Sequence, residues 1–559
     1  MGTNKIKYFV LLLFFCTSLT FAQAEYVPSD HSVYEFLNRM DSYHLLNNFN
    51  SFERPFTRSQ IARHLSAVIP NQNELTQIDR DILRDYITEF EFDLYGNTTN
   101  SSSLFSSSGY NFLSQKEKYL YFTADSAGSG LFVNFISSLQ NIPYYNYSDE
   151  TSANASFVQF GGILRGTLLK KFGFMIQGTN GKVWGDRAAA LTLDELKFNY
   201  KYNLDPNIHT ATDFVDNTEG HLSADFENVK IKIGRDKKTV GFGQINYILG
   251  SSIPGFDYVS LDLNYKIFTF SYFHGKLLGT LNDSIDVVQG NVKSITDKYI
   301  AYHRAGFDIS RHFSLGLGEV VIYSNRSIDF SYLNPFNFYK SVEHSNQDRD
   351  NSMMFLDIKN NSVKGLKIAG SVLIDDIDFS KAGTGWFGNQ LLYNLSIYSS
   401  NLNQIIPLDI ALQYIRIEPY VFTHRIHNNS YTHNYYSLTN PIQPNSEIFS
   451  FRLNYRPSHR VFLNLDITFM DHGANILGAD GTIIKNAGGD ALVGHREFDP
   501  TNAPFMDGYK ENYRNVTFDA VFEPYNNYFI SGRLNYQNNS LQFEDLNFLA
   551  AYIVFDIRI

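Results

Sequence analysis

Residues 324–352 combine aromatic rings with amide, carboxylate and guanidinium groups. The polar side chains near the end of this stretch are His344, Asn346, Gln347, Asp348, Arg349 and Asp350. Aromatic faces can stack on the C–H faces of sugar rings, while amides and carboxylates pair with hydroxyl groups. The alternative is a folded-in loop whose aromatics pack the lumen of a barrel and whose Asn and Asp residues form turns. We favour that alternative for residues 332–339 and leave both interpretations open for residues 344–350.

Trp386 is a second candidate for stacking on a sugar ring. It follows Gly383-Thr384-Gly385, and the chain has only one other tryptophan, Trp184. For both tryptophans, anchoring at a membrane interface is the favoured alternative, because indole rings prefer that boundary.

A set of ionisable residues lies at the ends of predicted strands. Its members are Arg235, Asp236, Glu319, Arg416 and Glu418. They could line a path for a glycan. We favour a lumenal network of ion pairs that holds loops in place, since charged groups away from bulk water must be paired.

The sequence contains no arrangement typical of catalysis. It has no Gly-x-Ser-x-Gly, no His-Glu-x-x-His and no phosphate-binding glycine loop. Asp375, Asp376 and Asp378 lie close together, but adjacent side chains on a strand point to opposite faces. We therefore expect no enzymatic activity, no metal site and no cofactor.

The elements that position these residues are β-strands. In residues 447–470, apolar side chains such as Phe449 and Leu463 alternate with polar ones such as Arg452 and Asp466 around a turn at 457–460. Similar alternation occurs at 196–202, 229–233, 259–265, 366–374, 516–522, 528–536 and 552–559. A half-buried soluble sheet shares this period of two, but the strongly polar second face and the many repeats favour a transmembrane barrel of about 18 antiparallel strands.

Connection lengths alternate along the chain. Short links are predicted near 227–228, 266–267, 310–312, 360–364, 400–406, 457–460 and 524–527. Long ones are predicted near 237–257, 279–298, 324–352, 376–389, 425–446 and 471–512. Outer-membrane barrels have short periplasmic turns and long external loops. This rule places the candidate loops outside the cell.

The first 115 residues differ from the rest. Residues 1–24 have a basic start, an apolar segment and the sequence Ala22-Gln23-Ala24, which is typical of a secretory signal peptide. Residues 25–95 show helical spacing with capping-box patterns at Ser32 and Thr57, and predict a small helical bundle or plug on the periplasmic side. Residues 96–115 read as a linker and 116–559 as the barrel.

Composition argues against a disulfide framework and against a nucleic-acid partner. The only cysteine, Cys16, lies in the signal segment, so we expect no disulfide framework in the mature chain. A formal net charge of −11 argues against a nucleic-acid partner, which requires a basic face. Nothing in the sequence points to a large exposed protein interface, so we expect a monomer in outer-membrane lipid.

A series of short motifs occurs in a specific order. In chain order they are Ile233-Gly234-Arg235-Asp236, Gly241-Phe242-Gly243, Ser251 to Phe256, Phe270 to Gly275, His303-Arg304, Gly318-Glu319 with Val321 to Tyr323, Tyr332 to Tyr339, Asp350-Asn351, Asp375-Asp376, Arg416 with Glu418-Pro419-Tyr420, Thr423-His424-Arg425 and Pro444-Asn445. The series resembles the Wzi capsule-assembly family, in the form found in Bacteroidetes-type bacteria, over nearly the whole mature chain. Members tend to carry Trp and Pro after the Gly-Arg-Asp motif, where this chain has Thr239 to Gly243.

The resemblance implies an eighteen-stranded outer-membrane barrel with a helical periplasmic plug. It also implies a surface lectin that binds capsular or exopolysaccharide and helps to assemble or attach the capsule. The alternative function is a porin for sugars or other small solutes. The two differ in whether the lumen is open.

Overall fold

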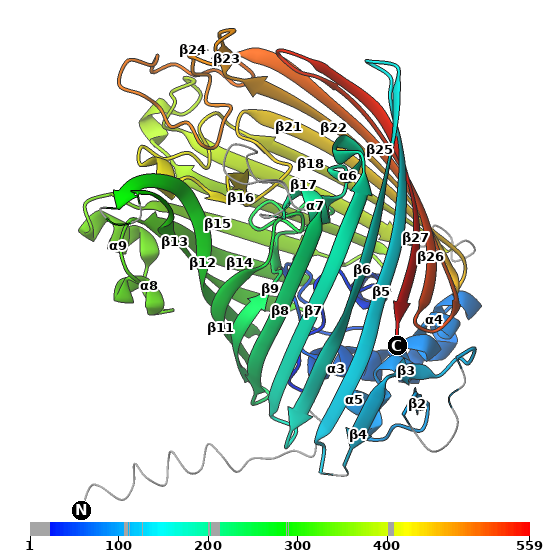
Figure 1. Cartoon of the computed structure of the whole chain (residues 1–559). Coiled ribbons are helices and arrows are strands. Elements are labelled where there is room, and N and C mark those ends of the chain that lie inside the picture. Colours follow the sequence, from blue (N-terminus) through cyan, green and yellow to red (C-terminus); the bar gives the residue numbers. More distant parts are fainter. Residues whose placement is uncertain are drawn as a thin grey trace, which may run out of the picture.

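A closed barrel of eighteen long antiparallel strands forms most of the molecule (Figure 1). The computed structural model describes residues 23–105, 110, 112–125, 127–199, 202, 213–286, 288, 290–400 and 407–559. The strands are β5 Gly130–Asn146, β6 Thr151–Leu168, β7 Phe172–Gly185, β8 Phe214–Asp225, β9 Val229–Asp236, β11 Phe256–Tyr265, β12 Phe268–Asp286, β13 Gly290–Ser310, β14 Phe313–Ser324, β15 Asn351–Asn360, β16 Leu366–Asp376, β17 Gln390–Ser400, β18 Leu408–Ile417, β21 Ser446–Ser458, β22 Val461–Ala474, β25 Tyr509–Tyr525, β26 Tyr528–Ser540 and β27 Asp545–Arg558. The predicted fold class is confirmed.

The barrel closes where β27 pairs with β5. Residues 548–558 of β27 pair with residues 136–146 of β5, and the short strand β4 (Tyr121–Ala124) pairs with the first residues of β5. The amphipathic C-terminal strand therefore completes the ladder and leaves no long open edge at the seam, as a membrane barrel requires.

The hairpin of β21 and β22 shows how alternation builds the wall. Phe449 and Phe469 lie opposite each other, face outward and are each 44% exposed. Arg452 and Asp466 also lie opposite each other, face the lumen and form an ion pair at 2.6 Å. The apolar face is thus turned to lipid and the polar face to the interior, as the sequence predicted.

The long connections lie at one end of the barrel, together with the short links between β5 and β6, β12 and β13, and β26 and β27, whereas the described links at the other end are all short (Figure 1). The sequence prediction is wrong at 279–298, where β12 and β13 continue as one extended hairpin to Asp286 and from Gly290. The interpretation fails there because a stretch rich in polar residues and containing two glycines resembles a loop in sequence, although its backbone pairs as a hairpin. The turn predicted at 400–406 falls almost wholly on residues 401–406, outside the described residues.

The strand predicted at 196–202 is also not formed. Residues 187–190 and 194–197 are the short helices α6 (Arg187–Ala190) and α7 (Asp194–Lys197). Their apolar side chains Ala189, Ala190 and Leu196 are buried against lumen-facing residues of β5, β6 and β27. These apolar residues are explained by their burial against the barrel wall and not by the alternation of a strand. Residues 200, 201 and 203–212 lie outside the described ranges.

The N-terminal segment forms a helical bundle at the short-turn end of the barrel (Figure 1). Its helices are α2 Val33–Ser42, α3 Arg58–Val68, α4 Gln77–Glu89 and α5 Glu91–Tyr95. The capping box at Thr57 is present, with Gln60 completing it. Ser32 makes no side-chain cap, and its hydroxyl instead accepts a hydrogen bond from Tyr86 at 2.9 Å. None of the helices described is long and apolar enough to cross a membrane.

The linker predicted at 96–115 is partly ordered in a small sheet. Strand β2 (Ser101–Ser103) pairs in parallel with β3 (Glu117–Tyr119). Residues 106–109 and 111 of that linker, like residues 1–22 of the expected signal peptide, lie outside the described part of the chain.

Buried ion pairs join the helical bundle to the barrel. The guanidinium of Arg39 bridges Asp79 of α4 (2.8 Å) and Asp409 of β18 (2.9 Å). The carboxylate of Asp41 binds Lys367 (2.6 Å) and Lys359 (3.5 Å) on neighbouring strands. Because these groups are nearly inaccessible to water, the bundle is fixed to the wall by charges that must remain paired.

The centre of the lumen is packed with apolar side chains. Strand β1 (Glu53–Arg54) of the N-terminal segment pairs inside the barrel with β10 (Thr239–Val240) of the connection 237–255. Phe52 stacks on Phe355 of the wall, with ring centroids 5.8 Å apart. The connection 418–445 joins the same core, where Tyr431 donates to the carbonyl of Ile248 at 2.8 Å. Three segments far apart in sequence thus meet across the lumen.

Candidate functional site

The connection 325–350 folds onto the outside of the barrel wall. It carries the helices α8 (Phe330–Leu333) and α9 (Tyr339–Ser345), which lie beside β12 to β14 (Figure 1). Val320 belongs to the lumenal core, whereas its neighbour Val321 packs with Tyr332 and Tyr339. Successive residues of a strand point to opposite faces. Tyr332 and Tyr339 of this loop are therefore packed, as we favoured, but against the outer wall and not in the lumen. Phe336 and Phe338, in contrast, are exposed.

The polar residues 344–350 divide into a buried anchor and an exposed remainder. Asp350 is fully buried, and its carboxylate accepts both Arg326 guanidinium nitrogens (2.8 Å each) and the Tyr332 hydroxyl (2.7 Å). The side chains of His344 and Asp348 are 64% and 60% exposed. Asp350 therefore holds the loop, while the residues before it are open to a ligand.

The remaining members of the stretch are held by their backbone. Gln347 and Asp348 adopt positive φ angles of 67° and 52°, and the carbonyls of both accept Arg425 Nη2. Asn429 donates to the carbonyl of Arg349 at 2.6 Å. Residues 344–349, including Asn346 at the end of α9, are thereby tied to the connection 418–445.

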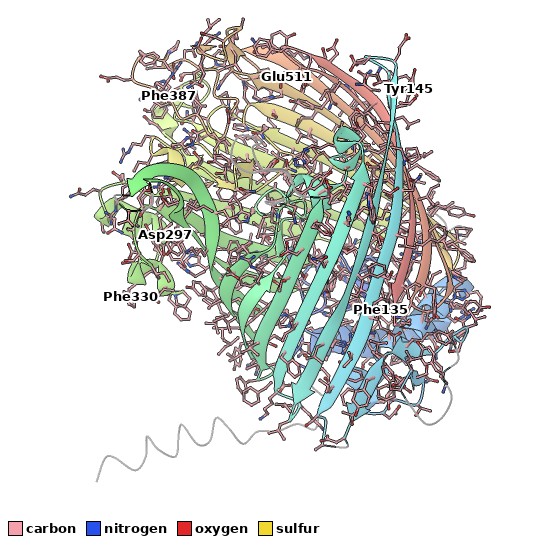
Figure 2. All side chains as sticks on the ribbon, in the orientation of Figure 1. Phe135, Tyr145, Asp297, Phe330, Phe387 and Glu511 are labelled. Atoms are coloured by element: carbon pink, nitrogen blue, oxygen red, sulfur yellow. The ribbon has the colours of Figure 1, made fainter. Side chains whose placement is uncertain are left out.

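Trp386 lies in a neighbouring part of the same end of the barrel. The Lys381 ammonium lies over its indole ring at 3.8 Å. The next residue, Phe387, which is labelled in Figure 2, is stacked on His495 with ring centroids 3.6 Å apart. Residue 386 also forms a bridge with Asn502. The connection 377–389 is therefore fixed against the connection 475–508.

The two predicted candidate regions are joined through a third connection. His427 Nδ1 donates to the carbonyl of Leu492 at 2.8 Å, close in sequence to His495. Arg425, two residues before His427, binds residues 347 and 348. We call the exposed parts of residues 344–349, 379–388, 424–429 and 490–498 the cap surface.

Sequence reasoning missed several members of the cap surface. Phe379 and Phe498 are each 78% exposed, although large aromatic side chains are usually buried. Arg425 and His495 organise the connections that present them. The available signal was an aromatic residue within a polar, turn-rich connection, which is weak when connections cannot be placed relative to one another.

Most residues of the predicted lumenal network do not face the lumen. Asp236 does face the interior, where it binds Lys232 and the Tyr258 hydroxyl. Arg235 instead lies on the outer face, on the same side as the exposed Ile233, and binds Asp257 at 2.9 Å. The alternation of a strand separates the two neighbours.

Arg416 and Glu319 also differ from the expected lumenal position. Arg416 lies between Ile415 and Ile417, which face the lumenal core, so its side chain faces outward; there it binds Glu418 at 2.8 Å and lies over Phe505. The carboxylate of Glu319 faces the outer wall beneath α9. It accepts the backbone N–H groups of Tyr339 (2.8 Å) and Lys340 (3.1 Å), and His303 donates to it at 2.9 Å. Both were predicted from their place at strand ends, which does not specify a face.

No metal-binding arrangement is formed within the ranges described, since no three His, Cys, Asp or Glu side chains gather. The cap surface offers exposed aromatic faces, amides and paired charges. It is suited to binding a polar molecule with apolar faces.

Comparison with solved structures identifies the architecture. Wzi, an outer-membrane protein of Escherichia coli involved in group 1 capsule assembly and a carbohydrate-binding β-barrel, matches with a TM-score of 0.56 and 11% sequence identity. The match covers 96% of this chain and 99% of that one. The chain has the fold of Wzi.

The Wzi fold extends over the helical bundle as well as the barrel, since nearly the whole chain is matched. Two channel-type barrels match less well. OccK8 (OprE) of Pseudomonas aeruginosa has a TM-score of 0.44, 11% identity and coverage of 77% of this chain and 98% of its own. A BenF-like porin of Pseudomonas fluorescens has a TM-score of 0.43, 9% identity and coverage of 76% and 99%. No protein-family model matches the sequence, and no curated protein is similar to it in sequence.

Proposed function

We propose that this barrel is a non-enzymatic, monomeric outer-membrane protein that binds capsular or exopolysaccharide at the cell surface. It helps to assemble or attach the capsule, with its helical bundle in the periplasm. One observation carries the proposal: four separate stretches of the chain are tied into one cap surface at the long-loop end. The Wzi fold supports it further, because the protein of that name binds carbohydrate.

The cap surface has the chemistry that a polysaccharide requires. The exposed Phe498 and the half-buried Trp386, one face of which is covered by the Lys381 ammonium, offer aromatic surface. Gln347, Asp348 and Arg349 offer hydrogen-bonding groups on a neighbouring part of the surface. Exposed contacts of this kind contribute about 1 kcal/mol each in a wet site. A long polymer that touches many of them at once gains affinity from their number.

The packed lumen favours binding at the surface over transport. Fully buried side chains such as Tyr247, Tyr302 and Val421 occupy the space that a solute would cross. A porin conducts through a water-filled lumen. The alternative function, a channel for sugars or other small solutes, therefore becomes one outcome of the test.

The test measures binding of the purified protein to polysaccharide from its own organism. Trp386→Ala should weaken binding about tenfold, which corresponds to about 1.4 kcal/mol. Trp184→Ala is the matched control, because Trp184 is 47% exposed on the barrel wall, outside the cap surface, and its loss should leave affinity unchanged.

Planar-bilayer conductance of the same preparation separates the two functions. We expect binding of the polysaccharide and no steady single-channel conductance. Stepwise conductance without binding of any glycan from the organism would replace the proposal with the porin function.

A further inference from the structure

The outer wall of β12 to β14 carries polar side chains where a lipid-facing wall should be apolar. Tyr272, His303 and Glu319 lie in one ladder row across the three strands and share the outward face. In the next outward-facing row, two residues before Glu319 on β14, Leu317 is 51% exposed and its partner Leu356 of β15 is 42% exposed. A carboxylate facing hydrocarbon is costly, so this part of the wall requires a cover.

The segment 328–343, which we call the wall segment, is that cover. His303 bridges it to the wall by donating Nδ1 to the carbonyl of Pro335 (2.9 Å) and Nε2 to Glu319 (2.9 Å). Tyr272 donates to the carbonyl of Leu333 at 3.1 Å. The polar groups of the wall are thus satisfied by the backbone of the wall segment.

The outer side of the wall segment is strongly apolar. Its exposed large apolar side chains are Ile328 (46%), Phe330 (84%), Phe336 (69%) and Phe338 (54%), and its exposed polar ones are Asn334 and Ser341. Figure 2 shows Phe330 projecting on the side away from the barrel. Four exposed bulky side chains within eleven residues are unusual for a surface in water.

This apolar side is continuous with the lipid-facing belt of the barrel. Phe336 stacks on Phe270 of β12, with ring centroids 5.1 Å apart and an interplanar angle of 21°. Phe270 belongs to the ladder row of Ala305, Leu317 and Leu356. The wall segment therefore extends down to the ladder row in which the uncovered wall exposes Leu317 and Leu356.

The backbone of the wall segment is paired as a lipid environment demands. Unsatisfied N–H and C=O groups are costly in hydrocarbon. Local side chains satisfy several of them: Ser331 N binds Asp329 Oδ1 (3.0 Å), Phe336 N binds Asn334 Oδ1 (3.1 Å), and Asn337 Nδ2 donates to the Ser331 carbonyl (2.7 Å). The asparagine residues that suggested sugar binding or turns in the sequence serve this role.

We propose that the wall segment is a lipid-binding anchor, with Phe330, Phe336 and Phe338 inserted among acyl chains of the outer leaflet. Aromatic side chains are preferred at this membrane boundary. The anchor fixes the distance of the exposed residues 344–349 from the membrane surface, because they follow directly after the wall segment. The inference does not depend on glycan binding.

Site-directed spin labelling tests the anchor directly. In a Cys16→Ser background the chain has no other cysteine, so Phe330→Cys, Phe336→Cys and Phe338→Cys each accept one nitroxide label. The labelled protein is reconstituted into vesicles of phosphatidylethanolamine and phosphatidylglycerol. Collision of the label with oxygen, which concentrates in lipid, is compared with collision with a water-soluble nickel chelate.

Two control sites define the outcomes. Leu317→Cys reports the lipid-facing wall, and Phe498→Cys, 78% exposed on the cap surface, reports water. We expect the three anchor sites to give the high ratio of oxygen to nickel collisions found at Leu317. A ratio like that of Phe498 would overturn the proposal, and so would shielding from both reagents, which would indicate a protein cover.

A second variant guards against loss of folding in the labelled proteins. Phe330→Asp should lower the heat stability of the barrel in vesicles, judged by its heat-dependent migration on gels. Phe498→Asp should leave it unchanged. Equal stability of the two variants would contradict insertion of Phe330 into lipid.

Discussion

Individual charged residues show how strongly neighbours in sequence can differ. Asp348 and Asp350 are two positions apart, yet the first is open to water and the second is fully buried between Arg326 and Tyr332. Arg235 and Asp236 are adjacent, yet they lie on opposite faces of the wall. The role of each carboxylate depends on its partners, so we expect substitutions of Asp348 and Asp350 to have different effects.

Asp350→Asn should loosen the wall segment. The substitution removes charge-assisted hydrogen bonds to Arg326, each worth about 1.5–3 kcal/mol. Limited proteolysis should therefore cleave residues 325–350 about tenfold faster or more. Asp348→Asn is the control, because an exposed ion pair contributes little, and its cleavage rate should stay close to that of the wild type. Equal rates for both variants would show that Asp350 does not hold the segment.

Asp41 should make the attachment of the helical bundle sensitive to acid. Burial of the Asp41 carboxylate raises its pKa, but the ammonium groups of Lys367 and Lys359 outweigh this effect and hold the pKa below 3.8. A lowered pKa in the folded state stabilises the protein at pH values above the unfolded value of about 3.9, and the stabilisation is lost as pH falls through the folded value.

Asp41→Asn should accordingly cost about 3–5 kcal/mol at neutral pH, because it leaves two buried lysines without their carboxylate partner. Denaturant titrations between pH 3 and pH 7 measure this loss. Between pH 7 and pH 3 the free energy of unfolding should also fall less in this variant than in the wild type, because the variant has no carboxyl group to protonate at position 41. Asp81→Asn, which removes a helix-surface pair with Arg84, is the control. A wild-type stability that does not fall below pH 4 would contradict the linkage.

At the scale of elements, the long connections adopt three different positions. The connection 237–255 turns into the lumen, 325–350 covers the outer wall, and 377–389 and 475–508 pack together at the rim. The connection 418–445 contributes to both the lumenal core and the cap surface. Strand geometry sets where each connection starts, whereas its contacts with other connections set where it lies.

Replacing residues 344–349 with a Gly/Ser linker should weaken polysaccharide binding without disturbing the barrel. Asp350 is kept, because its ion pair with Arg326 holds the wall segment. The strands β14 and β15 on either side pair with each other and do not depend on the loop. Binding of purified protein and the glycan retained on cells should both fall, with more polysaccharide released into the medium.

The matched control replaces residues 478–482, the tip between β23 (Ile476–Leu477) and β24 (Ile483–Lys485), with the same linker. This tip lies at the same end of the barrel but outside the cap surface. A folded 344–349 variant that keeps full glycan binding would remove these residues from the site.

At the scale of the whole molecule, the two ends of the barrel are chemically distinct. The helical bundle lies at one end, where the described links between strands are all short, and every long connection lies at the other end (Figure 1). An outer-membrane barrel places its long loops outside the cell. The glycan and lipid proposals both depend on this orientation.

Labelling of single cysteines tests the orientation in intact cells. In the Cys16→Ser background, Ala479→Cys in the connection 475–508 should react with a membrane-impermeant maleimide. Ser362→Cys, exposed in the turn between β15 and β16, should react only after the outer membrane is permeabilised. Asn526 is unsuitable as a second site, because it is buried beneath the linker and bonded to Gln115. Labelling of Ser362→Cys in sealed cells would invert the topology.

The sequence by itself determined the barrel. The alternation of Phe449 and Phe469 with Arg452 and Asp466 is a local property, because a strand exposes successive side chains on opposite faces wherever it lies. The same rule identified the terminal strand, and a second local rule, the spacing of apolar residues on one helix face, identified the helices around Val33 and Ile61. The alternation rule failed at residues 196–202, where short helices are buried against the wall, and at 279–298, where a polar, glycine-containing stretch forms paired strands.

Only the tertiary structure decided what the long connections do. The sequence prediction placed Glu319 at the end of a strand like Asp236, but it lies within β14 and beneath α9, because Tyr339, twenty residues later, returns along the outer wall. Residues 347 and 348 join the surface of Trp386 only through Arg425 and the connection 475–508. These contacts link residues that are distant in sequence, and their formation depends on the closed ladder that brings the connections together. No local spacing encodes such contacts, so the sequence identified the residue types of the site and the fold determined their partners.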